Sequence, residues 1–197
     1  MVKAKKRWAK RIAAVALACA LGTGAVGALV GCSSDSKSNS DEMSVAWTSN
    51  AGEYNLDPTN NYMGWQGSYL GIYEQLFRID ANFDPQPMLA ESAEMVNDTT
   101  WKITIREGVT FQNGNELNAQ AVADCLNRTI SMNERAKKSL DIANMEADGN
   151  VLTVTTNSLN TAFKNELSEP VASIIDVNSG AAEDEPVGTG PYKIDSV

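Results

Sequence analysis

The chain has 197 residues, is 43% hydrophobic, carries a formal net charge of −9 and contains no histidine. This composition is ordinary for a chain that buries a core, but the acidic balance argues against a nucleic-acid partner, because phosphate contacts need a basic face. The lack of histidine excludes catalytic triads built on that residue within this chain and removes the usual ligand of soft metals.

The first 31 residues have the pattern of a secretory leader. The first 11 carry six Lys and Arg and no acid, and residues 12–30 are apolar and small, which are the marks of a signal peptide. The run ends in Leu29-Val30-Gly31-Cys32, which resembles a lipobox, where the cysteine is acylated and becomes the first mature residue. A transmembrane anchor is the alternative, because the run approaches the roughly 20 residues of a span. Its Ala- and Gly-rich composition and its end at Cys32 favour a signal peptide over residues 1–31 and a lipid anchor.

Residues 32–197 keep a formal charge of −15, because six of the 16 basic residues and none of the 25 acidic ones lie in the leader. Residues 32–42 are mostly Ser, Asp, Asn and Lys, which predicts a flexible tether. With Cys19 removed and Cys32 lipidated, Cys125 is the one ordinary thiol. We therefore expect no disulfide and no zinc cluster, and a buried structural role for Cys125.

The first half of the mature chain mixes helical and extended patterns. Residues 45–47 predict a first strand, and residues 62–77 predict a helix from apolar spacing. A proline-bearing turn is expected at 82–87, followed by a short helical or irregular piece at 88–95. Strict alternation over 100–106 predicts a half-buried strand whose core-facing side chains are Trp101, Ile103 and Ile105.

The second half continues in the same mixed way. Asn113-Gly114 predicts a tight turn, and Asn118 is placed to cap a helix over 119–130. Further helices are expected at 134–145 and 161–167, and strands at 151–155, 171–177 and 192–194. Strands mixed with helices, without a repeat period, indicate an α/β or α+β fold.

Four segments together resemble a known family, the extracytoplasmic solute-binding proteins (family 5) of ABC importers for peptides and nickel. The resemblance rests on their order and spacing over nearly the whole mature chain. The segments are Leu56-Asp57-Pro58 with residues 72–77 (IYEQLF), residues 87–92 (PMLAES), residues 100–111 with Asn113-Gly114 and Ala119-x-x-Val122, and residues 186–192 (PVGTGPY).

The resemblance implies an α/β fold of the class II periplasmic-binding-protein type, with two lobes and a ligand cleft between them. Because such proteins are roughly twice this length or more, we expect residues 43–197 to form the first lobe only, with the second lobe absent. Its sheet would come from about 43–80 and 171–197, and a smaller subdomain from about 81–170. The implied partners are ABC permease subunits and a peptide or other small solute, with no cofactor and no resident metal.

The candidate ligand-binding residues are Asn50, Tyr62, Trp65 and Arg135. Asn50 follows the first strand, where open α/β sheets meet ligands; Tyr62 and Trp65 offer aromatic surface; Arg135 could pair a carboxylate bidentately. The alternatives are a core role for Trp65 and a solvated helix position for Arg135.

The tract at 140–144 looks closer to nickel-type members of the family. The resemblance implies that chelate-binding members carry a Trp just before it and an Arg after the proline matching Pro170. This chain has Ser139 and Val171 there, which leaves peptide and nickel complex both open.

Two other function classes are the alternatives. An extracellular hydrolase would need a nucleophile with a base, yet the sequence has no G-x-S-x-G motif and no histidine, so no catalytic residue is assigned. A structural or interaction lipoprotein that uses a partial solute-binding lobe as a scaffold is the other alternative.

Overall fold

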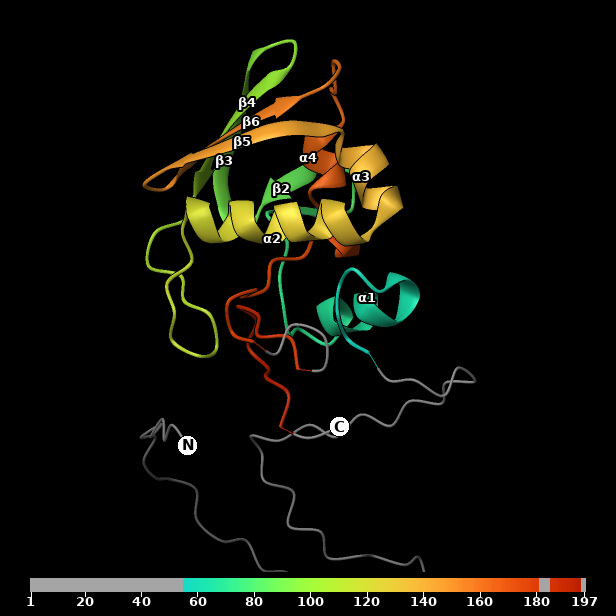
Figure 1. Ribbon diagram of the computed structural model, residues 1–197, viewed down its shortest axis with the longest axis vertical. Helices are drawn as coiled ribbons and strands as arrows, with labels where there is room; N and C mark the ends of the chain where they lie inside the picture. The colour runs from blue at the N-terminus through green and yellow to red at the C-terminus, as the bar shows by residue number, and fades with distance from the viewer. Residues whose placement is uncertain (1–54, 181–184, 196–197) are drawn as a thin grey trace, which may run out of the picture. The chain divides into compact units, whose positions relative to one another are not determined.

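The computed structural model, which describes residues 55–180 and 185–195, has a four-stranded antiparallel sheet, drawn at the top of the described part in Figure 1. Its strands are β3 (Ala90–Asn97), β4 (Thr100–Ile105), β6 (Val151–Thr156) and β5 (Ile142–Asp148), in that spatial order. Short turns join β3 to β4 and β5 to β6, and the longer β4–β5 connection contains two helices. These are α2 (Ala119–Met132) and α3 (Glu134–Leu140).

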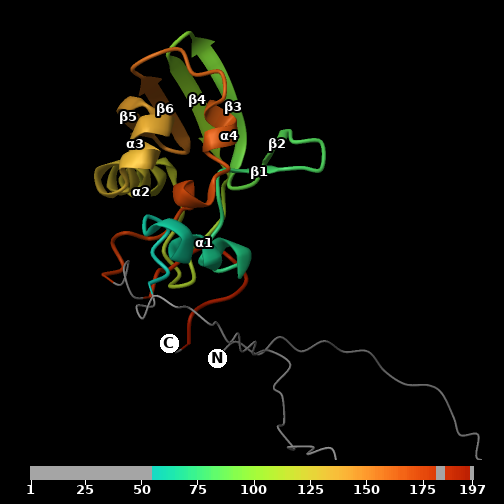
Figure 2. The same cartoon turned by 90° about the vertical axis from the view of Figure 1, so that its right-hand side faces the viewer.

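The remaining elements flank this sheet. A two-stranded hairpin pairs β1 (Phe77–Ile79) with β2 (Pro85–Pro87), and Figure 2 shows it reaching out beside the sheet. Helix α1 (Asn61–Tyr69) precedes the hairpin, while α4 (Phe163–Glu166) and the 3-10 turn η1 (Pro170–Ala172) follow the sheet. Among the residues that the structure describes, no helix has the length and apolar character needed to cross a bilayer.

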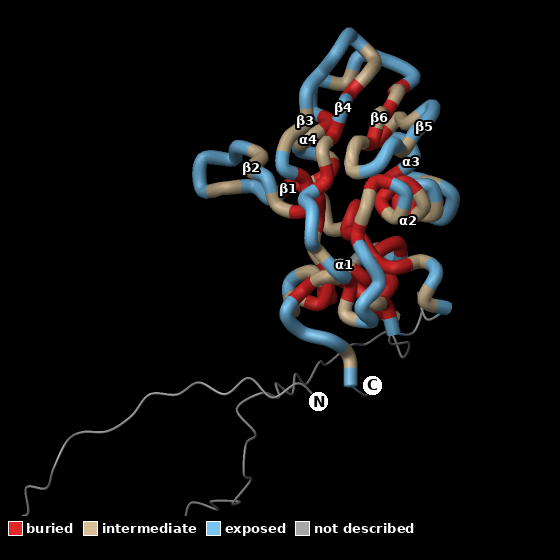
Figure 3. The backbone as a smooth tube through the Cα atoms, turned by 90° about the vertical axis from the view of Figure 1, so that its left-hand side faces the viewer, coloured by how far each residue is buried: buried red, intermediate tan, exposed pale blue. Residues whose placement is uncertain are grey.

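The alternation of β4 builds one face of the core, as the sequence predicts. Trp101, Ile103 and Ile105 are buried while Lys102 is exposed, because successive side chains of a strand point to opposite faces. On β6, Leu152 and Val154 stand opposite Ile103 and Trp101. Figure 3 shows the buried positions continuing from the sheet into the segments around α1.

Helix α2 covers this apolar face. Its start is fixed by Asn118, whose side-chain oxygen accepts a hydrogen bond of 3.0 Å from the amide of Ala121, which confirms the expected cap. Cys125 on α2 is 1% exposed, and burial raises the pKa of its thiol to about 11. A cysteine with so high a pKa is inert at neutral pH, so the expected structural role is confirmed.

Two expected helices end earlier than the sequence pattern predicts. Helix α1 stops at Tyr69 rather than continuing to 77, because Gly71 adopts a φ of +71°, which glycine tolerates and a helix does not. Helix α3 stops at Leu140, where Asp141 takes a left-handed φ of 48°. The rest of the expected helix at 134–145 belongs instead to strand β5.

Three other segments differ from the expected secondary structure. Residues 88–95, expected to be helical or irregular, include most of β3, which gains backbone hydrogen bonds from β4. Residues 171–177, expected to be a strand, begin in η1 and make a single bridge, between Ile174 and Glu74. Within the described residues no strand covers 192–194.

The domain boundaries stay a prediction. The four-stranded sheet lies inside the stretch expected to be the smaller subdomain, 81–170. The leader, the tether and the expected strand at 45–47 fall outside the described residues.

Candidate functional site

The segments that carry the family resemblance meet at one junction. The amides of Leu89 and Ala90 donate to the carbonyls of Gln75 and Leu76, which ties residues 87–92 to residues 72–77. The amides of Gly190 and Tyr192 donate to Ile72 and Gly71, at 3.0 Å and 3.2 Å. Segments more than 100 residues apart in sequence are thus held together mainly by their backbones.

Gln112 fastens this junction with its side chain. Its Nε2 lies 2.7 Å from the carbonyl oxygen of Ile72 and 3.0 Å from that of Gly190, and it also reaches the carbonyl of Tyr192. Its Oε1 accepts from the amide of Gly188 at 3.2 Å. A side-chain amide has two N–H donors, so the three carbonyl oxygens share the two hydrogens of Gln112. The hydrogen-bonding groups of this side chain are therefore all engaged within the protein.

A buried ion pair anchors the Leu56-Asp57-Pro58 motif. Asp57, 2% exposed, receives both guanidinium nitrogens of Arg128 on α2, together with the amide and hydroxyl of Thr59 at 2.8 Å and 2.7 Å. Burial alone would raise the pKa of Asp57, but the hydrogen bonds from Arg128 and Thr59 outweigh it and hold that pKa below its ordinary value. The motif therefore serves as a charged clamp between the start of α1 and α2.

A second buried carboxylate organises the Asn113-Gly114 turn. Asp176, 5% exposed, accepts from the side-chain amides of Asn113 and Asn115, both at 2.7 Å. Burial pushes the pKa of Asp176 upward, and these two amides with the Asn178 backbone bring it below its ordinary value. The expected turn is confirmed, with Gly114 at a φ of +90°.

The two glycines of the Gly188-Thr189-Gly190 loop are explained by close approach of the backbone. A Cβ at Gly188 would lie 2.2 Å from the carbonyl oxygen of Ile72, and one at Gly190 would lie 2.1 Å from that of Gly71. No side chain fits at either position without moving the junction. This loop therefore has a structural role.

Gly188→Ala should destabilise the protein by about 1–3 kcal/mol, the usual cost of overpacking a well-packed site. Urea denaturation monitored by circular dichroism measures it. Thr189→Ala is the matched control: it removes one hydrogen bond to Glu74 and inserts no atom, so it should cost about 0.5–1.5 kcal/mol. Equal stability of Gly188→Ala and the wild type would contradict the packing at this junction.

Two of the four predicted ligand-binding residues lie together, outside this junction. The guanidinium carbon of Arg135 on α3 lies 5.2 Å from the ring centroid of Trp65 on α1. Arg135 also pairs with Glu169 at 3.1 Å, a partner that the sequence did not suggest. Trp65 is partly buried.

The remaining predicted site residues differ in where they fall in the chain. Tyr62 lies in α1, three residues before Trp65. Asn50 and Cys32 fall outside the described residues. Of the two positions compared with nickel-type relatives, Val171 is 3% exposed, and the hydroxyl of Ser139 faces its own helix carbonyl at Ala136.

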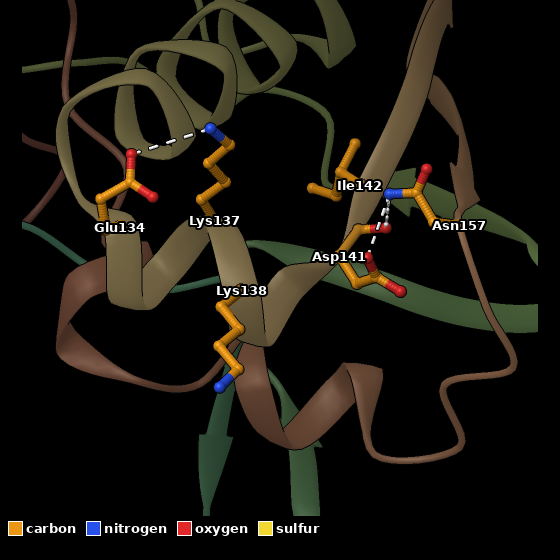
Figure 4. A pocket seen from close by; sticks show the side chains of 6 residues that line it. All are labelled: Glu134, Lys137, Lys138, Asp141, Ile142 and Asn157. Carbon is orange, nitrogen blue, oxygen red and sulfur yellow. Dashed lines mark hydrogen bonds and ion pairs between the residues drawn. The ribbon is translucent and has the colours of Figure 1, made fainter.

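A surface hollow of about 500 Å³ lies at the end of α3. It is lined by Glu134, Lys137, Lys138, Asp141, Ile142 and Asn157. In Figure 4 the two lysine side chains point in different directions, and Asn157 bonds to Asp141. Hydrogen bonds from Ser158 and Asn157 lower the pKa of Asp141, so its carboxylate is already engaged, and the hollow does not gather charges on one point. The described ranges also contain no group of three or more His, Cys, Asp or Glu side chains able to hold a metal ion.

Comparison with known proteins identifies the class. A family model, bacterial extracellular solute-binding proteins, family 5 Middle, matches residues 84–197. The nickel-binding protein NikA of Staphylococcus aureus is 34% identical over 126 residues, which is 64% of this chain and 26% of that protein. The glutathione-binding protein GsiB of Escherichia coli K12 is 34% identical over 138 residues, with the same shares covered.

Solved structures agree on the fold. A nickel ABC transporter protein from Bacillus halodurans has a TM-score of 0.70 and 39% identity, over 73% of this chain and 30% of that chain. NikA from Staphylococcus aureus in complex with Ni(L-His)2 also has a TM-score of 0.70, with 30% identity over 74% of this chain and 31% of that chain. The fold is therefore that of class II periplasmic binding proteins, of which this chain matches a part.

The chain belongs to the family 5 bacterial extracellular solute-binding proteins. It spans about a quarter of the length of the curated relatives it matches, because the matched region makes up 26% of each relative. The family consists of solute-binding proteins, and it is the family that the sequence segments were expected to indicate.

Proposed function

We propose that this protein is the substrate-binding component of an ABC importer, which captures a peptide or a nickel complex outside the cytoplasmic membrane and delivers it to permease subunits. The observation that carries this proposal is the junction described above. The segments that carry the family resemblance also make the hydrogen bonds that hold this part of the chain together. The resemblance therefore involves the residues that stabilise the fold. The proposal assigns binding and release, and no catalysis.

The ligand surface in this proposal is formed by Trp65 and Arg135, with Tyr62 and Asn50 as further contacts. Trp65 and Arg135 support it because they come from different helices yet make a cation–π contact. An aromatic face beside a guanidinium suits small solutes that carry both apolar and charged groups.

The relatives point to two candidate classes of solute, peptides and nickel complexes. Among them, one is named for nickel and another for glutathione, which is itself a small peptide. We propose peptide as the first candidate and a nickel complex as the second. Chelate-binding relatives are expected to offer Arg and Trp where this chain has the buried Val171 and has Ser139, whose hydroxyl donates to a carbonyl of its own helix.

Uptake by cells tests this proposal. Deletion of the gene in the source bacterium should lower uptake of a labelled tetrapeptide, or of radioactive nickel supplied with histidine, and the wild-type gene should restore it. The double variant Trp65→Ala/Arg135→Gln should restore much less, while Arg78→Gln, an exposed change on β1, should restore it fully. Unchanged uptake of both solutes in the deletion strain would contradict the proposal.

Cys32 is proposed to be the lipid-bearing first residue of the mature protein. Cys32→Ser should release the protein from membranes or leave the leader uncut, because the thiol is the nucleophile that takes the lipid. Membrane fractionation with mass spectrometry of the N-terminus measures both results, with Cys125→Ser as the control that keeps the anchor. Retention of a processed Cys32→Ser protein on membranes would contradict the assignment.

A further inference from the structure

The side chain of Arg135 contacts an aromatic ring and a carboxylate, and most of its hydrogen-bond donors are left over. Its guanidinium lies over Trp65 with 5.2 Å between the guanidinium carbon and the ring centroid. One nitrogen, Nη2, donates to Oε2 of Glu169 at 3.1 Å. Trp65 lies on α1, Arg135 on α3, and Glu169 just before η1. The fold thus brings Arg135 to Trp65, 70 residues earlier in the sequence, and to Glu169, 34 residues later.

Most of the donors of Arg135 remain open. A guanidinium carries five N–H donors in a planar fork, and among the described residues Arg135 makes one hydrogen bond, to Glu169. The side chain of Arg135 is 60% exposed and that of Glu169 is 46% exposed. The Trp65 ring and the Glu169 carboxylate both contact the guanidinium and limit its movement. A planar anion that binds the free edge of the fork therefore loses less side-chain freedom than it would on a free arginine.

We propose that Trp65, Arg135 and Glu169 form a receptor for a carboxylate group of the transported solute, and that the incoming carboxylate replaces Glu169 on Arg135. The inference rests on the proposed function and names the chemical class of its ligand. Glu169 offers one oxygen to one nitrogen, whereas a free carboxylate can take two parallel N–H bonds, which is the stronger arrangement. Because exposed ion pairs contribute little to stability, the exchange disturbs the fold little.

The proposal gives Glu169 a definite role. With the ligand absent, Glu169 neutralises Arg135, and with the ligand bound, it is released to solvent. Removing the charge of Glu169 should therefore tighten carboxylate binding, whereas a merely structural ion pair would show no such gain.

Nitrogen-15 spectra of the arginine Nε–H groups test the proposal directly, on the full chain kept in solution with a mild detergent. Acetate is the probe, with sodium chloride at equal ionic strength and acetamide as controls. The Arg135 signal, assigned by its loss in Arg135→Lys, should shift saturably with acetate alone. In Glu169→Gln the dissociation constant should fall by about two- to fivefold, the factor that corresponds to a surface ion pair. The Nε–H signal of Arg78, on β1, should stay unchanged.

Two results would overturn the inference: an Arg135 signal that does not respond to acetate, or one that responds with equal affinity in the wild type and Glu169→Gln. Backbone amide spectra of each variant establish that it is folded. Failure here is distinct from failure of the proposed function, because cellular uptake of peptide or nickel is measured without acetate and can persist through other contacts. A normal acetate response with no effect of gene deletion on uptake would leave the receptor standing and remove the transport role.

Discussion

Replacing Asp57 with alanine should lower the free energy of unfolding by about 3–5 kcal/mol, the cost of removing one partner of a buried ion pair. Asp57 is 2% exposed and Arg128 is 17% exposed, so the substitution leaves a guanidinium in a poorly solvated place. Urea denaturation of the full chain at pH 7 measures the change.

Two control variants separate the buried charge from the lost contacts. Asp57→Ala/Arg128→Met should recover part of the loss, because it removes both charges and keeps apolar volume. Glu134→Ala breaks an exposed pair, in which Lys137 Nζ lies 3.7 Å from Glu134 Oε1, and should cost less than about 1 kcal/mol. Similar losses in Asp57→Ala and Glu134→Ala would contradict the clamp.

The same clamp predicts the pH dependence of stability. The pKa of Asp57 is lower in the folded protein than in the unfolded chain, so the folded state is stabilised fully above the unfolded pKa of about 3.9. This stabilisation is lost as the pH falls through the lower, folded pKa. Between about pH 4 and pH 2, wild type should therefore lose stability more steeply than Asp57→Ala.

Ile103→Ala should cost about 2–5 kcal/mol, the range for emptying a fully buried aliphatic site. Ile103 is 0% exposed, lies on β4 between two other strands and stands opposite Leu152 of β6. The neighbouring Lys102→Ala is the matched control, because Lys102 is on the exposed face of the same strand, and it should change stability by less than about 0.5 kcal/mol. Calorimetric unfolding of both variants checks the pair, and a loss of stability in Ile103→Ala no larger than that in Lys102→Ala would show that β4 does not face the core.

The sequence predicts best where the pattern is local and strong. The alternation at 100–106 and 151–155 and the cap at Asn118 need no distant information, and all three are confirmed. Strand β3 (AESAEMVN) contains few β-branched residues, and it becomes a strand because β4 offers it backbone partners. The same reason applies to the last part of the expected helix at 134–145, where β6 recruits Ile142–Asp148.

The site divides in a similar way. Trp65 and Arg135 could be singled out as residue types suited to a ligand, but Glu169 could not, because nothing in the sequence brings position 169 to position 135. The clamp of Asp57 on Arg128 and the contacts of Asp176 with Asn113 and Asn115 join residues 71, 63 and 61 positions apart. Gly71 was a missed local signal: a glycine at the end of an apolar period is a known helix stop.

We propose that this protein binds a solute at the surface formed by Trp65 and Arg135. The most direct measurement is a set of backbone amide spectra of the full chain, titrated to millimolar concentration with a panel of tetrapeptides and with the nickel–histidine complex. We predict saturable shifts for at least one solute class, concentrated around Trp65, Arg135 and Glu169 and lost in Trp65→Ala/Arg135→Gln. Saturable shifts confined to the exposed side of the sheet around Lys102, or the absence of binding by every member of both classes, would contradict it.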